Sequence, residues 1–129
     1  MLRVESGAAD FRGLFEAGRA AGVRIGWLEL SAPGPLPAGL AAAAGAGALR
    51  AVGVGSGTSA AVKALHGEAV LADLLREHFR GCAAVLVAGQ VDAPLLEPGP
   101  DGWRMTPAGE AARRYDSASL LAALRAPRL

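Results

Sequence analysis

The sequence predicts an α/β (or α+β) fold in a single domain, with a mixed sheet of about five to seven strands and helices packed on one or both faces. Three observations predict it. Residues 82–88 are an uninterrupted apolar run, which is typical of a buried strand. Residues 68–80 place leucines at helical spacing, and residues 23–30 carry large apolar side chains in both alternating sets.

The N-terminal part predicts a strand, a helix and a second strand. Residues 2–5 suit a short strand, and Asp10 then suits the N-cap of a helix because its carboxylate can accept a hydrogen bond from the first turn. Gly22 suits the C-terminal cap of this helix, where a positive φ is favourable. Residues 23–30 follow as a strand, and we expect it to be central and covered on both faces.

The prolines of residues 31–37 predict a loop, and the alanines after them predict a short helix over residues 37–44. Gly45 ends this helix in our interpretation. Because alanine and glycine bury little surface, a flexible connector is the alternative.

Residues 49–65 allow two interpretations. If residues 58–65 continued into the helix of residues 68–80, that helix would have apolar side chains on opposite sides and Gly67 in its middle. A β-hairpin avoids this conflict, with strands over residues 49–54 and 60–65 and a turn at Gly55-Ser56-Gly57-Thr58. We favour the hairpin, and a helix that begins at a phosphate-binding loop stays the alternative.

The C-terminal part predicts four further elements. Gly81 ends the helix of residues 68–80, and a buried strand follows over residues 82–88. Residues 94–105 predict a second hairpin, with PGPDG as its turn. A short helix is expected from Thr106-Pro107 towards Arg113, and a last helix begins at Asp116 or Ser117.

One glycine-rich loop invites a functional interpretation. A turn of this kind after a strand lets backbone amides approach a phosphate or carboxylate, and its hydroxyl groups can add donors at a helix N-terminus. The complete dinucleotide, P-loop and nucleophile-elbow motifs are all missing. In the hairpin interpretation the same glycines supply only positive φ. The candidate ligand-binding residues are Gly53, Gly55, Ser56, Gly57, Thr58 and Ser59.

No complete set of catalytic or metal-binding residues is recognisable. A hydrolytic set would need Ser56 or Ser59 with His66 as the base and an acid such as Glu68, and sequence cannot supply that geometry. His78, Cys82 and His66 could begin a zinc site, but no fourth ligand is credible. We therefore expect no metal and no cofactor, we name no catalytic residue, and we leave open whether the protein is an enzyme.

The charges argue against a nucleic-acid binder. Thirteen basic and twelve acidic residues are interspersed, whereas a binder of phosphates normally carries a basic stripe. The N-terminus lacks the apolar region of a signal peptide, and the longest uncharged stretch is broken by prolines and glycines. With a single cysteine, these features predict a cytoplasmic protein that neither enters nor spans a membrane.

The high apolar content has two explanations. The chain is 52% hydrophobic with a mean hydropathy of +0.31. Either small side chains fill the core of a tightly connected fold, or a second copy or a protein partner covers an apolar surface. We therefore expect a non-catalytic module that forms a homo-oligomer or docks on a protein partner. Trp103 is the interface candidate, and packing of its ring over the sheet is the alternative. A protein or enzyme that binds a small anionic ligand at Gly53–Ser59 is the second hypothesis.

Overall fold

The computed structural model describes residues 1–30, 38–63 and 70–125. The chain packs into two compact units, one of Met1–Ala32 with Leu74–Leu129 and the other of Pro33–Asp73. The first unit contains a six-stranded sheet, and the second contains a two-stranded sheet with a helix. The predicted mixed sheet with helices is confirmed, and the expectation of a single domain stays a prediction.

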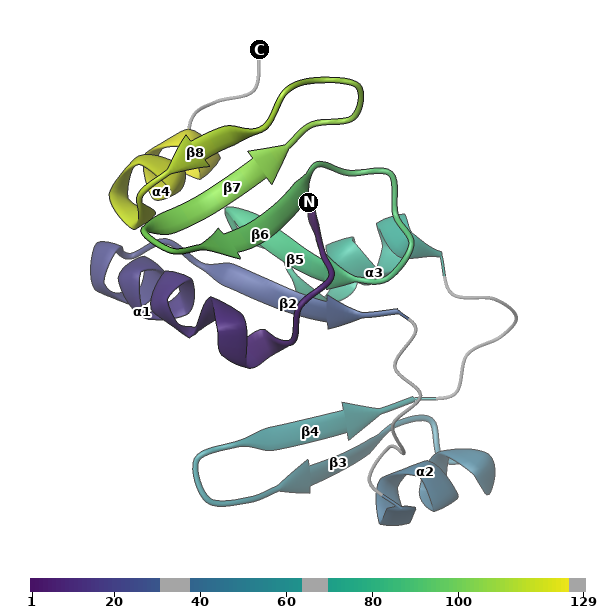
Figure 1. Ribbon diagram of the computed structural model, residues 1–129. Coiled ribbons are helices and arrows are strands. Elements are labelled where there is room, and N and C mark those ends of the chain that lie inside the picture. Colours follow the sequence, from purple (N-terminus) through teal and green to yellow (C-terminus); the bar gives the residue numbers. More distant parts are fainter. Residues whose placement is uncertain (31–37, 64–69, 126–129) are drawn as a thin grey trace. The chain divides into compact units, whose positions relative to one another are not determined.

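The larger unit is built on a mixed sheet, whose strands are β1 (Leu2–Val4), β2 (Ile25–Glu29), β5 (Ala84–Ala88), β6 (Leu95–Gly99), β7 (Gly102–Thr106) and β8 (Arg113–Tyr115). Their order is β2-β5-β1-β6-β7-β8 (Figure 1). The pairs from β2 to β6 are parallel, and the β6–β7 and β7–β8 pairs are antiparallel.

Strand β5 is buried on both faces, as its apolar run predicts. It pairs with β1 and β2, so that Leu86 lies between Leu2 and Trp27. Leu86 and Val87 point to opposite faces because side chains alternate along a strand, and neither is accessible to solvent. Strand β5 therefore forms the centre of the core.

Strand β2 is an edge strand, so the prediction of a central strand in residues 23–30 was wrong. Within the described part of the chain it pairs with β5 alone. Its side chains nevertheless have neighbours: Trp27 lies 5.9 Å from Phe11 and 6.3 Å from Phe15, measured between ring centroids. Apolar residues in both alternating sets of β2 therefore indicated that both faces of the strand are covered. They carried no information about how many strands pair with it.

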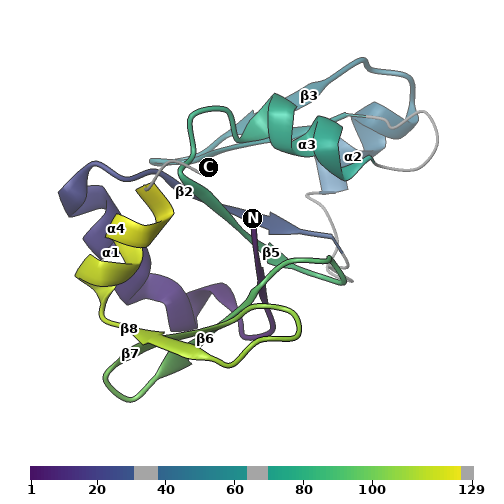
Figure 2. The same ribbon diagram turned by 90° about the horizontal axis from the view of Figure 1, so that it is seen from above.

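Helices α1 (Arg12–Ala21) and α4 (Ser117–Arg125) lie side by side on one face of the sheet (Figure 2). Gly22 ends α1 with a φ of 70°, as predicted. The predicted N-cap at Asp10 was wrong, because Asp10 lies inside a 3-10 helix (Ala8–Phe11) and Phe11 precedes α1. The buried residues of this core are Leu2, Val4, Phe11, Leu14, Val23, Leu86, Leu96, Trp103, Leu120 and Leu121.

The turn after helix α3 (Leu71–His78) covers the opposite face at β2. A β-carbon at Gly26 would lie 2.7 Å from Cε1 of Phe79 and 3.5 Å from the sulfur of Cys82. The Phe79 ring therefore occupies the space that a side chain at Gly26 would need. Helix α3 ends at His78, so the prediction that Gly81 ends a helix of residues 68–80 was wrong, although Gly81 has a φ of 85° in the turn that follows.

Residues 107–113 form a turn that leads into β8, so the prediction of a short helix there was wrong. The amide of Glu110 donates to the carbonyl of Pro107 at 3.2 Å, and Gly109 has a φ of 72°. A residue with positive φ ends a helix, and the chain returns along β7 with Arg113 opposite Met105.

The smaller unit consists of helix α2 (Ala38–Gly45) and the hairpin of β3 (Ala51–Val54) and β4 (Ser59–Val62). The predicted helix and hairpin are both confirmed, while residues 64 and 65 lie outside the described residues. The side chain of Leu40 packs against Gly53, where a β-carbon would lie 3.3 Å from Cδ1 of the leucine. Gly53 therefore lets the helix approach the hairpin closely.

Candidate functional site

The glycine-rich loop is the turn of the β3–β4 hairpin. Val54 pairs with Ser59, and the amide of Gly55 donates to the carbonyl of Thr58 at 2.8 Å. Ser56 and Gly57 form the tip, and Gly57 has a φ of 81°. The glycine at this position supplies the positive φ that the turn requires.

This geometry lacks the helix N-terminus that an anion-binding loop would use. Thr58 and Ser59 lead into strand β4, so their amides do not open a helix. The candidates from Gly55 to Ser59 are exposed, and Gly53 lies within β3 towards α2. The structure thus brings the six candidates onto one hairpin without gathering them around an enclosed space, and ligand binding by them stays a prediction.

The outer face of this hairpin is apolar and exposed. Val52 and Val54 point away from α2 and are 59% and 84% exposed. Their cross-strand neighbours are Ala61 and Ser59, which are also exposed. Leu49, just before β3, is 90% exposed. We call Val52, Val54, Ser59 and Ala61 the hairpin face.

Both edges of the hairpin are open in the part of the chain that the structure describes, because β3 and β4 pair only with each other there. Neither strand contains a charged residue or a proline. Monomeric proteins commonly protect such edges with lysine, proline or a bulge. Within the strands themselves the hairpin therefore lacks a charge or a proline that would hinder pairing with another chain, and its flanking charges are Arg50 and Lys63.

Trp103 packs over the sheet, which is the alternative that the sequence left open. It is 8% exposed, it stacks on Phe11 with 5.6 Å between ring centroids, and its Nε1 donates to Oγ of Ser117 at 3.0 Å. Its indole N–H is thus satisfied inside the molecule. We base no interface on Trp103.

The other chemically interesting residues lie apart. His78 is exposed at the end of α3, with its ring edge towards Phe79, and the thiol of Cys82 is half-buried. His66 and Glu68 lie outside the described residues. Among the residues that are described, no three His, Cys, Asp or Glu side chains gather in a way that could hold a metal ion.

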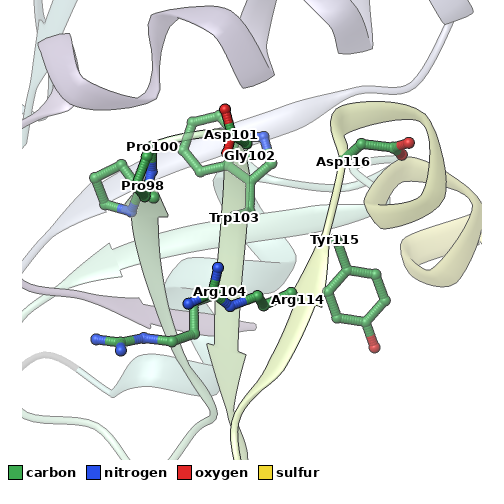
Figure 3. A pocket seen from close by; sticks show the side chains of 10 residues that line it. Pro98, Pro100, Asp101, Gly102, Trp103, Arg104, Arg114, Tyr115 and Asp116 are labelled. Atoms are coloured by element: carbon green, nitrogen blue, oxygen red, sulfur yellow. The ribbon is translucent and has the colours of Figure 1, made fainter.

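A cavity of about 440 Å³ lies beside the β6–β7 turn and the end of β8 (Figure 3). Sequence reasoning missed it because it assigned a helix to the residues that lead into β8. The only signal available was the proximity of Arg113 and Arg114 to the hairpin of residues 94–105. The cavity is lined by Pro98, Gly99, Pro100, Asp101, Gly102, Trp103, Arg104, Arg114, Tyr115 and Asp116.

Among the residues that line the cavity, Asp116 has a lowered pKa. The Ser119 amide donates to its carboxylate at 2.7 Å, and this hydrogen bond, with a smaller contribution from the Ser119 side chain, lowers the pKa of Asp116 below 3.8. The bond places Asp116 at the N-cap of α4, as predicted. Asp116 therefore carries a negative charge at neutral pH.

Two further findings concern membranes and known proteins. Among the described helices, none is both long and apolar enough to cross a lipid bilayer. The comparisons with protein-family models, with curated proteins and with solved structures find no match to the chain.

Proposed function

We propose that the protein is a non-catalytic module that self-associates through the β3–β4 hairpin, with a second copy of the chain as its partner. The observation that carries this proposal is the exposed hairpin face, where Val52 and Val54 lie beside two unprotected strand edges. Apolar surface of this kind is closed in most soluble proteins by a partner or by the protein itself.

We expect the two copies to associate by pairing of their backbones at the strand edges. An isolated two-stranded hairpin is marginally stable in water, and a third and fourth strand satisfy the amides and carbonyls of its edges. Two hairpins that pair edge to edge make one four-stranded sheet, in which the valines of both copies share a face. Association therefore supplies backbone hydrogen bonds, and cross-strand contacts between side chains of the two copies add to them.

A second copy is the partner that fits these edges best. The strands themselves carry no charge, and a copy of the same hairpin presents an equally neutral edge. A two-fold axis brings the same strand of each copy together, so every contact is made twice. Binding of a different protein is an outcome that the experiment below separates from self-association.

The test is sedimentation velocity from about 1 to 200 μM, which spans the affinities of ordinary homodimers. We expect wild type to shift from monomer to oligomer with rising concentration. Val54→Lys places a charge on the hairpin face and should raise the dissociation constant at least about tenfold, which corresponds to ~1.4 kcal/mol.

Val70→Lys is the matched control, because Val70 is 57% exposed and lies outside the hairpin. This variant should associate as wild type does. A wild-type monomer at every concentration contradicts self-association, and a protein captured by that monomer but not by Val54→Lys would assign the hairpin face to a different partner. Equal association of Val54→Lys and wild type would remove the hairpin from the interface.

A further inference from the structure

Two glycines line the cavity beside the β6–β7 turn. Gly99 lies opposite Gly102 in the last pair of the hairpin, with only Pro100 and Asp101 between them. A β-carbon at Gly102 would collide with the carbonyl oxygen of Tyr115. The Tyr115 carbonyl therefore occupies the space that a side chain at Gly102 would need, and the backbones of β7 and β8 lie close together at this end of the cavity.

Two arginines stand side by side at this cavity. Arg104 of β7 pairs with Arg114 of β8, so that their side chains lie on the same face of the sheet (Figure 3). Like charges directly opposite each other across two strands destabilise the pair. A group of opposite charge beside the pair therefore relieves the repulsion.

Only one of these two charges is compensated among the described residues. Arg104 donates from Nε and Nη2 to Oε2 of Glu97, at 3.1 and 2.8 Å. Across the described ranges, no hydrogen-bond or ion-pair partner is found for Arg114. Arg114 therefore holds an uncompensated guanidinium at the wall of the cavity.

Two carboxylates also line the cavity, and they lie away from the arginine pair. Asp101 is in the β6–β7 turn, and the carboxylate of Asp116 is directed to α4, where it accepts the Ser119 amide. Figure 3 shows both carboxylates beyond the guanidinium groups, towards the turn and the helix. The cavity is thus negative at one end and positive at the other.

We propose that this cavity binds a small organic oxyanion, a carboxylate or a phosphate monoester. The charged group pairs with Arg114, since a planar guanidinium binds two oxygens of such an anion at once. The apolar part of the ligand lies beside the prolines of the turn. A volume of about 440 Å³ suits a ligand of this size. This site is separate from the β3–β4 hairpin and does not depend on the proposed self-association.

The experiment is a titration followed by ¹H–¹⁵N correlation spectra of the full chain, with phenyl phosphate and benzoate as probes and benzyl alcohol as the uncharged analogue. Saturable shifts are expected at the amides of Gly102 and Tyr115 with one or both anions. Arg114→Gln should weaken binding about tenfold or more, as expected for the loss of a charged hydrogen-bond partner.

Arg113→Gln is the matched control, because Arg113 is the neighbouring residue and lies opposite Met105, on the other face of the sheet. It should leave the affinity unchanged, and Arg114→Lys should give an intermediate loss because it keeps the charge and loses the bidentate geometry. The proposal is overturned if neither anion saturates these shifts, if Arg114→Gln binds as wild type does, or if benzyl alcohol binds equally well.

Discussion

Gly102 shows at the scale of one residue how the backbone restricts the sequence. Its φ of 150° is a conformation that residues with a β-carbon rarely adopt, and a β-carbon there would collide with the carbonyl oxygen of Tyr115. Gly109 also has positive φ, but open space surrounds its missing side chain. Substitutions at these two glycines therefore allow the cost of backbone strain to be measured apart from the cost of steric collision.

Gly102→Ala should lower the free energy of unfolding by about 2–4 kcal/mol, because strain and collision act together. Gly109→Ala should cost about 1 kcal/mol, since only the strain applies. Urea denaturation of both variants and of wild type measures the difference. Equal losses in the two variants would show that β8 moves away without cost, which contradicts the close pairing of β7 and β8.

At the scale of an element, α4 depends on the cap at its first turn. The carboxylate of Asp116 accepts a hydrogen bond from the Ser119 amide, and this bond is the main cause of its lowered pKa. The Leu120 amide donates to the Asp116 carbonyl at 3.0 Å. Ser117 links the helix to the sheet because its hydroxyl accepts a hydrogen bond from the indole N–H of Trp103. The helix is thus positioned by its N-terminal residues as well as by its buried leucines.

The lowered pKa of Asp116 predicts a pH-dependent contribution to stability. A carboxyl group whose pKa is lower in the folded state stabilises the protein above its unfolded pKa, near 3.8, and loses this contribution as the pH falls through the folded pKa. Asp116→Ala should therefore be less stable than wild type at neutral pH, and the difference should shrink in acid.

Asp116→Asn is the control, because asparagine caps a helix as well as aspartate does and has no charge to titrate. Its stability should stay close to that of wild type at neutral pH. Thermal unfolding of the three proteins between pH 7 and pH 2 is the measurement. A difference between wild type and Asp116→Ala that does not change with pH would contradict a role for the ionised carboxylate.

At the scale of the whole molecule, the two units differ in how much they bury. Among the described residues of the smaller unit Ala51 alone is buried, whereas the larger unit surrounds β5 on both faces. A unit of about 40 residues has too little core to be stable without further support. Association through the hairpin would supply part of that support.

Hydrogen exchange should report this difference. The amides of β5 should open only with global unfolding, and those of β3 and β4 should exchange about 100-fold faster or more. Raising the protein concentration should slow exchange in β3 and β4 and leave β5 unchanged, because association protects only the hairpin. Equal protection of both strand sets at low concentration would show that the smaller unit is as stable as the larger one.

The local sequence was sufficient for most elements and for the hairpin at the glycine-rich loop. Turns, helix ends and apolar periods depend on residues that are neighbours in the chain, so Gly22 and Asp116 could be assigned without the fold. Residues 107–113 were misassigned because a proline that can start a helix also suits a turn, and pairing with β7 decides between them.

What only the tertiary structure decided is which residues meet. The edge position of β2, the burial of Trp103 and the pairing of Arg104 with Arg114 depend on strand order and register, which join segments distant in the sequence. The apolar composition did not say where exposed apolar side chains lie, and the structure places two of them, Val52 and Val54, on the β3–β4 hairpin. The physical reason is that side-chain patterns report burial, whereas neighbours across a sheet are set by how the whole chain packs.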